Sequence, residues 1–136
     1  MRATAAIAGL GITEMGKVYG RTASDFAGEA IALALEDAGL EAGDVDGLLI
    51  NANQSTEMVP TLQFSLGLTD LTLVNVMSAF GSTAGTMLQY AAHAIATGQA
   101  SVVACLYADA PLTEGGSISQ SGYNGRRFNA SIGYYW

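Results

Sequence analysis

The stretch from Leu71 to Ala108 contains no aspartate, glutamate, lysine or arginine, and this absence limits the possible folds. A membrane-spanning helix needs about 20 consecutive and mostly apolar residues. Polar residues such as Asn75, Gln89 and His93 interrupt every window of that length. A strand, a helix and a strand at the centre of a layered domain fit better, because a helix covered on all sides needs no polar face. We therefore expect no membrane span.

Composition narrows the class of protein further. The chain has 136 residues, enough for one domain, and only 12% of them are charged, so we expect part of its surface to be covered by something else. A net charge of −7 with five lysines and arginines argues against binding to nucleic acid or an anionic membrane. The single cysteine excludes an internal disulfide, and no signal peptide begins the chain, so we expect a cytoplasmic protein.

Hydrophobic periodicity predicts alternating strands and helices. Strands are expected at Thr4–Leu10, Gly47–Ile50, Leu71–Met77 and Ser101–Tyr107. Helices are expected from Thr22 or Ser24 to Gly39, at Pro60–Leu66, and from about Ser82 to Thr97. Thr22 and Asp25 resemble a capping box, and Gly39 suits the left-handed end of a helix. Strands separated by helices predict a parallel sheet with crossover connections.

The segment from Val74 to Gly98 is the best candidate for chemistry. Its strand runs through a tight turn into a helix rich in small residues, which places Ser78 beside the helix N-terminus. Free N–H groups and the helix dipole favour negative charge there, and enzymes seat nucleophiles or oxyanions at such positions. Two simpler interpretations stay open: Ser78 only fits a crowded turn, and Asn75 only hydrogen-bonds the turn backbone. Cys105, in the middle of a strand, is expected to be a buried packing residue.

Four sequence blocks together resemble the N-terminal half of the thiolase superfamily, nearest its sterol-carrier-protein-linked, lipid-transfer-type branch. They are A-A-I-A-G-L-G-I-T-E-M-G, S-D-F-A-G-E-A-I-A-L-A-L-E-D-A-G-L, V-D-G-L-L-I and V-N-V-M-S-A-F-G-S-T-A-G, within residues 5–109. The resemblance implies an α/β fold, the N-terminal half of an αβαβα arrangement, with a mixed, mostly parallel sheet and a buried central helix. It implies that residues 1–110 form this half domain and that residues 111–136 form a Gly/Ser-rich loop leading into a missing remainder.

The last block departs from the family pattern at the position that matters most. Aligning Gly81 with the family glycine puts Asn75 on the family asparagine and Ser78 on the nucleophilic cysteine. A serine hydroxyl does not ionise as a thiol does and needs a general base. His93 lies about three turns into its helix, too remote to serve. The catalytic histidine and second cysteine of the family belong to the other half.

In lacking this cysteine, the chain resembles a group of family members that cleave acyl-CoA thioesters by a retro-aldol reaction, as in steroid side-chain breakdown. These work with a small partner protein carrying an OB-fold and a zinc ribbon. We therefore expect the whole protein to be such a lyase, with a coenzyme A thioester as substrate and no covalently bound cofactor or metal. A thiolase-type acyltransferase, such as an acetyl-CoA acetyltransferase, and a non-catalytic subunit are the alternatives. The 136-residue chain alone is expected to be inactive.

Further residues are assigned to substrate binding as expectations. Phe80 and Gly81 lie in the turn, and Arg126, Arg127 and Tyr123 lie in the loop near the end of the chain. The arginines suit a coenzyme A phosphate. The simpler interpretation is that they are an ordinary pair of solvated side chains. For Tyr123 the simpler interpretation is aromatic packing. Strand 71–77 is apolar on both faces, and the resemblance implies that it pairs with its twofold mate. We expect a homodimer.

Overall fold

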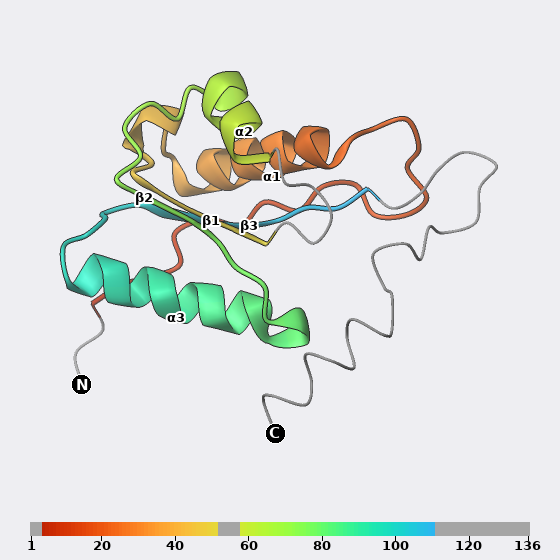
Figure 1. Cartoon of the computed structure of the whole chain (residues 1–136). Helices are drawn as coiled ribbons and strands as arrows, with labels where there is room; N and C mark the ends of the chain where they lie inside the picture. The colour runs from red at the N-terminus through yellow and green to blue at the C-terminus, as the bar shows by residue number, and fades with distance from the viewer. Residues whose placement is uncertain (1–3, 52–57, 111–136) are drawn as a thin grey trace.

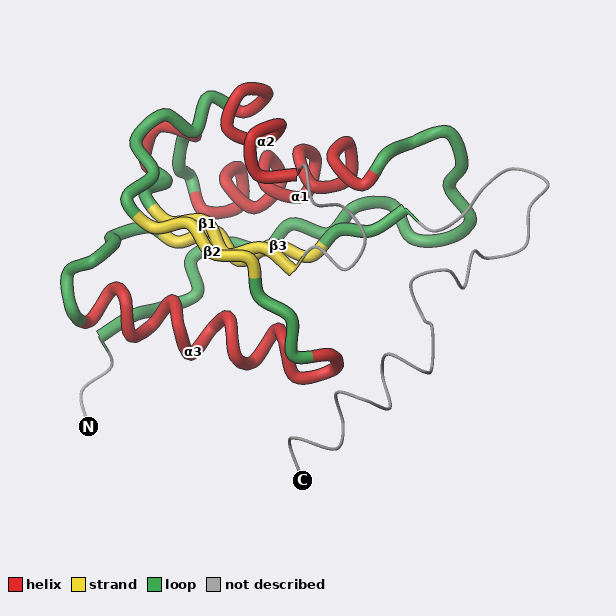
Figure 2. Tube along the Cα trace, in the orientation of Figure 1, coloured by secondary structure: helices red, strands yellow, loops and turns green. Residues whose placement is uncertain are grey.

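The computed structural model describes residues 4–51 and 58–110, which form an α/β fold (Figure 1). Its sheet has three parallel strands in the order β2-β1-β3, with β1 (Gly47–Asn51) between β2 (Leu73–Val76) and β3 (Val103–Tyr107). Helices α1 (Ala23–Ala38) and α2 (Met58–Leu66) cover one face, and α3 (Thr83–Ala96) lies on the other (Figure 2). The predicted parallel sheet with helical crossovers is confirmed.

Local signals explain both ends of α1. The Thr22 hydroxyl accepts a hydrogen bond from the backbone N–H of Asp25, and the Asp25 carboxylate accepts one from the backbone N–H of Thr22. This reciprocal pair is the predicted capping box. At the other end Gly39 adopts a φ of 67°, a left-handed conformation that glycine adopts without steric cost.

Apolar side chains fill both sides of the central strand. Leu48 and Ile50 of β1 pack with Ile31 of α1 and Leu62 of α2. Leu49 points to the opposite face, where its core partners are Leu73, Met87, Ala91, Ala94 and Ala100. All five residues of β1 are buried, as expected for a strand covered on both faces.

The carboxylate of Asp46 ties the start of β3 to the start of β1. One of its oxygens accepts hydrogen bonds from the backbone N–H groups of Ser101 at 2.9 Å and Val102 at 2.8 Å. The other oxygen also accepts a hydrogen bond from the backbone N–H of Ser101, at 2.8 Å. These bonds fix the relative position of two segments that lie far apart in the sequence.

The first predicted strand is wrong, because residues 4–10 form no strand. The three strands that do form pair directly, β1 with β3 from Gly47 with Val103 to Asn51 with Tyr107. The N-terminal segment instead lies against α1, where an added Cβ on Gly9 would come within 2.2 Å of the carbonyl oxygen of Ala34.

Burial is incomplete on one helix and one strand of the described chain. Helix α3 buries Thr83, Met87, Ala91 and Ala94, whereas Leu88 is 46% exposed, so one side of the helix is open in this chain. The prediction that Cys105 is buried is wrong: its side chain is exposed on β3, an outer strand of the sheet. Nearby atoms still remove enough water to raise the pKa of the Cys105 thiol above its usual 9.0.

Element boundaries differ from the prediction by one or two residues. β2 and β3 are shorter than predicted, α2 begins two residues earlier, and a single 3-10 turn (Phe80–Ser82) precedes α3. Among the residues that the structure describes, no helix is long and apolar enough to cross a membrane.

Candidate functional site

The carboxyl ends of the strands and the N-terminus of α3 meet at one edge of the sheet (Figure 2). β1 ends at Asn51, which pairs with Tyr107 at the end of β3. On the other side, the backbone N–H of Met77 donates to the carbonyl of Ile50 at 2.8 Å, so the chain leaving β2 begins its turn beside β1. Ligands of open α/β sheets bind at this edge.

A network of short hydrogen bonds holds the turn between β2 and α3. The Thr83 hydroxyl accepts from the backbone N–H of Ala79 at 2.8 Å and donates to the carbonyl of Phe80 at 2.7 Å. The Ser82 hydroxyl donates to the carbonyl of Ala79 at 2.7 Å. The Ser82 side chain makes no cap for α3, and the Thr83 N–H at the start of the helix donates to the carbonyl of Phe80.

The turn also holds one residue in an unfavourable backbone conformation. Phe80 has a φ of 51°, a left-handed value that is uncommon for any residue with a side chain. Such strain persists where the surrounding structure enforces it, and it is concentrated at functional sites. The Phe80 side chain is 54% exposed at the same edge of the sheet.

The predicted site residues are only partly brought together. Ser78 is exposed, and no described residue hydrogen-bonds its hydroxyl, while Asn75 is half-buried and pairs with Leu49 in the sheet. Gly81 is exposed, and an added Cβ would meet nothing within 4 Å, so packing of the described residues does not require glycine there. His93 lies in the last turn of α3, at the opposite end of the helix from Ser78. Arg126, Arg127 and Tyr123 lie outside the described residues.

Sequence reasoning missed Asn51, because the predicted strand Gly47–Ile50 ended one residue before it. It is the last residue of β1, it is 6% exposed, and its Oδ1 atom has no hydrogen-bond partner. Buried polar atoms are nearly always hydrogen-bonded, so an unpaired one calls for an explanation. The available signal was an asparagine directly after the apolar run of the central strand.

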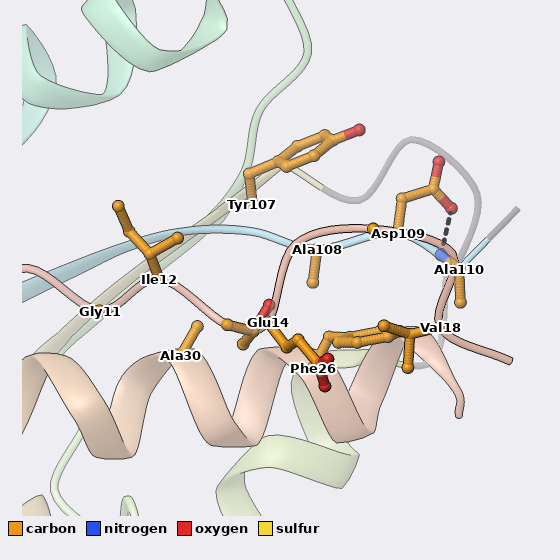
Figure 3. A pocket seen from close by; sticks show the side chains of 12 residues that line it. Gly11, Ile12, Glu14, Val18, Phe26, Ala30, Tyr107, Ala108, Asp109 and Ala110 are labelled. Atoms are coloured by element: carbon orange, nitrogen blue, oxygen red, sulfur yellow. Dashed lines mark hydrogen bonds between the residues drawn. The ribbon is translucent and has the colours of Figure 1, made fainter. Parts of the chain in front are cut away.

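A cavity of ≈ 400 Å³ lies at the same edge but on the α1 side of β3 (Figure 3). Phe26, Ala30 and Ala108 contribute apolar surface, and Glu14 and Asp109 contribute carboxyl groups, whereas none of the described residues that line it is Lys or Arg. The Tyr107 side chain points away from α1, toward the other face of the sheet (Figure 3). Desolvation, and then the charge of Asp109, raise the pKa of Tyr107 above its usual 10.0.

Within residues 4–51 and 58–110, no three His, Cys, Asp or Glu side chains group closely enough to hold a metal ion. The described part of the site therefore offers helix N–H groups, one buried amide oxygen, hydroxyl groups and an exposed aromatic ring. This set can bind and polarise a carbonyl group, but it does not include a general base next to Ser78.

No family model matches the chain. The chain is 42% identical over 102 residues to the steroid side-chain-cleaving aldolase of Thermomonospora curvata, covering 74% of this chain and 26% of that protein. It is 40% identical over 100 residues to the 17-hydroxy-3-oxo-4-pregnene-20-carboxyl-CoA lyase of Mycobacterium tuberculosis, covering 73% and 25%. The chain thus spans about a quarter of the length of the curated relatives it matches.

Solved structures give a consistent result. An Ltp2-ChsH2(DUF35) aldolase matches with a TM-score of 0.68 and 40% identity over 74% of this chain and 26% of that one. A 3-oxoacyl-[acyl-carrier-protein] synthase III from Aquifex aeolicus matches with a TM-score of 0.53 at 23% identity, over 59% and 27%, which indicates a shared fold alone. The expected thiolase-like fold is supported at this coarse level, and the sequence is similar to enzymes named as aldolases and lyases.

Proposed function

We propose that the whole protein cleaves a carbon–carbon bond of a β-hydroxyacyl-CoA by a retro-aldol reaction, with a steroid side chain as the acyl group. The observation that carries this proposal is the similarity to two proteins named for such cleavage, at 42% and 40% identity. The matched regions cover about three-quarters of this chain, which supports the same chemistry at the shared edge of the sheet. Because the chain spans only about a quarter of each relative, the activity of the whole protein is a proposal.

The reaction places clear demands on the site. A base removes the proton of the β-hydroxyl, a carbonyl forms there, and the bond between the α and β carbons breaks. The electron pair passes into the thioester as an enolate, and the α carbon then takes a proton. The products are a ketone and a shorter acyl-CoA.

The uncapped N-terminus of α3 suits the enolate oxygen. The N–H groups that follow Thr83 have no side-chain cap, and together with the positive end of the helix dipole they suit charge that develops on a carbonyl oxygen. The base must come from outside the described residues, since Ser78 has no partner there and His93 lies at the far end of α3. An acyltransferase working through Ser78 would likewise need a base from outside the described residues, so the similarity to the named aldolase and lyase, and not the base, favours cleavage.

The proposal includes protein partners and a cytoplasmic location. β2 is an outer strand, and its Val74 and Val76 side chains are 42% and 56% exposed, which favours pairing with a second copy through strand 71–77. A small partner with an OB-fold and zinc ribbon stays part of the proposal. The two-part designation of the Ltp2-ChsH2(DUF35) aldolase is consistent with a second protein.

The test is a cleavage assay of the full-length protein, alone and with its partner, on 17-hydroxy-3-oxo-4-pregnene-20-carboxyl-CoA. We expect the 17-ketone and a shorter acyl-CoA in equal amounts by mass spectrometry, with no mass added to the protein. A covalent acyl group on Ser78 would instead establish an acyltransferase. Absence of both products and adduct would favour a non-catalytic subunit. Ser78→Ala is the matched variant and is expected to keep cleavage activity.

A further inference from the structure

The unpaired amide of Asn51 lies at the edge of the sheet where α3 begins. Asn51 is 6% exposed, and its Oδ1 atom lacks a hydrogen-bond partner. Side chains alternate along a strand, so Asn51 points to the same face as Leu49, which packs against α3. The buried oxygen therefore faces the space between the sheet and the first turns of α3.

The neighbouring polar groups do not satisfy this oxygen. Thr83 is buried on the face of α3 that packs on the sheet, one helical turn before Met87. Its single hydroxyl proton is already donated to the carbonyl of Phe80 at 2.7 Å. This space thus faces one unpaired amide oxygen and the first turn of α3, where the Thr83 N–H donates to the carbonyl of Phe80 and no side chain caps the N–H groups that follow.

A complementary ligand carries a carbonyl oxygen for the N–H groups and an N–H or O–H donor for Asn51. Given the proposed function, a β-hydroxyacyl-CoA has two kinds of donor, its hydroxyl and the amides of its pantetheine arm. The hydroxyl has one proton, which the base must remove, and an asparagine amide is no base at this pH. The amide donor is therefore the better partner. In a thioester it lies two methylene groups beyond the sulfur, within the same short segment as the carbonyl.

We propose that Asn51 is a substrate-binding residue whose Oδ1 accepts a hydrogen bond from the first pantetheine amide N–H, while the N-terminus of α3 faces the thioester oxygen. This inference rests on the proposed function and assigns the recognition of the thiol arm to the central strand. It predicts that Asn51 acts on the arm of the substrate and not on its acyl group.

The test compares two truncated substrates in the full-length protein with its partner. Both carry the same β-hydroxyacyl group; one is the N-acetylcysteamine thioester, and the other replaces the amide by an alkyl chain of equal length. We expect the wild type to show a kcat/KM about tenfold higher for the amide thioester, the effect of one neutral hydrogen bond. Asn51→Leu should lose this preference and keep its rate on the alkyl thioester, whereas Asn51→Asp, which retains an acceptor, should keep the preference.

The alternative is that Asn51 only supports the fold. Asn51→Leu would then lower kcat/KM for both thioesters by the same factor, and this result, or an unchanged preference, would overturn the inference. Asn51→Ala, which also lacks an acceptor, serves the same comparison if the leucine variant does not fold. A wild type that cleaves neither thioester nor the full coenzyme A substrate would contradict the proposed function, an outcome distinct from the failure of the Asn51 assignment.

Discussion

The contact between the N-terminal segment and α1 leaves no room for a side chain at Gly11. An added Cβ would lie 2.0 Å from the carbonyl oxygen of Ala30 and 2.7 Å from the backbone nitrogen of Ala34. Both obstacles are backbone atoms, which cannot turn aside as a flexible side chain can. Gly11→Ala must therefore push the segment away from α1 by roughly 1 Å, since packed carbon and oxygen atoms stay more than about 3 Å apart.

Two effects of opposite sign determine the magnitude. Overpacking of this kind costs about 1–3 kcal/mol, and contacts to backbone atoms favour the upper end. Alanine restricts the unfolded chain more than glycine does, which returns about 0.4–1 kcal/mol. We expect Gly11→Ala to lower the free energy of unfolding by about 2 kcal/mol. A smaller loss, about 1 kcal/mol, applies if the whole segment detaches and gives up the 2.9 Å bond from the Leu10 N–H to Asp37.

The measurement is urea-induced unfolding of the chain followed by far-ultraviolet circular dichroism, and hydrogen exchange at Leu10 separates displacement from detachment. Gly43→Ala is the matched control, because an added Cβ there meets nothing within 4 Å and its φ is not in the left-handed region. The control should change the free energy of unfolding by less than about 1 kcal/mol. Equal stability of the two variants would refute the described contact between this segment and α1.

Four other predictions follow from hydrogen bonds and burial. Asp46→Ala leaves the N–H groups of Ser101 and Val102 without their acceptor. It should lower the free energy of unfolding by about 2 kcal/mol in the same urea assay. An unchanged free energy would show that water replaces the carboxylate. Thr22→Ala removes the cap of α1 and should cost about 1 kcal/mol, and Thr22→Ser, which keeps the hydroxyl, should not. The capping bonds lower the pKa of Asp25 below 3.8 in the folded state. The contribution of Asp25 to the free energy of unfolding is therefore complete above pH 3.8 and is lost as the pH falls through the pKa of the folded state. An unchanged pH dependence of stability in Asp25→Asn would contradict this. The raised pKa of Cys105 keeps its thiol protonated at pH 8, so alkylation should be slower than that of free cysteine despite the exposed side chain.

Signals confined to one element were sufficient to predict that element. The capping box and Gly39 defined α1, and an apolar run between turns defined β1, because these patterns reflect interactions between residues near in sequence. The N-terminal segment is equally apolar, yet it lies against α1 and not in the sheet, and such contacts between distant segments are not reported by any local pattern. The predicted burial of Cys105 was wrong for a related reason, because the exposure of its side chain depends on which strand is outermost in the sheet.

The candidate site divides in the same way. The strand–turn–helix arrangement around Ser78 could be predicted from glycine, serine and the apolar run, since these residues define the turn itself. The left-handed Phe80 and the unpaired Asn51 could not, because backbone strain and missing hydrogen bonds depend on atoms that only the folded chain brings together. Asn51 in particular looks like an ordinary loop residue until its neighbours in β2 and β3 are known.

Given the proposed function, the distribution of charge indicates which parts of a coenzyme A thioester this chain would contact and which parts the rest of the protein would contact. The charge-free stretch 71–108 surrounds the N-terminus of α3, so no carboxylate from it opposes an enolate there, and Glu14 and Asp109 line the cavity on the α1 side instead. The described residues include only two cationic side chains, Lys17 and Arg21, and Arg21 is paired with Glu29 and stacked on Phe26. Phosphates of coenzyme A need cations that these residues do not supply. The described edge of the sheet is therefore suited to the thioester and its amide arm, while the phosphates and the base must be met by groups outside it.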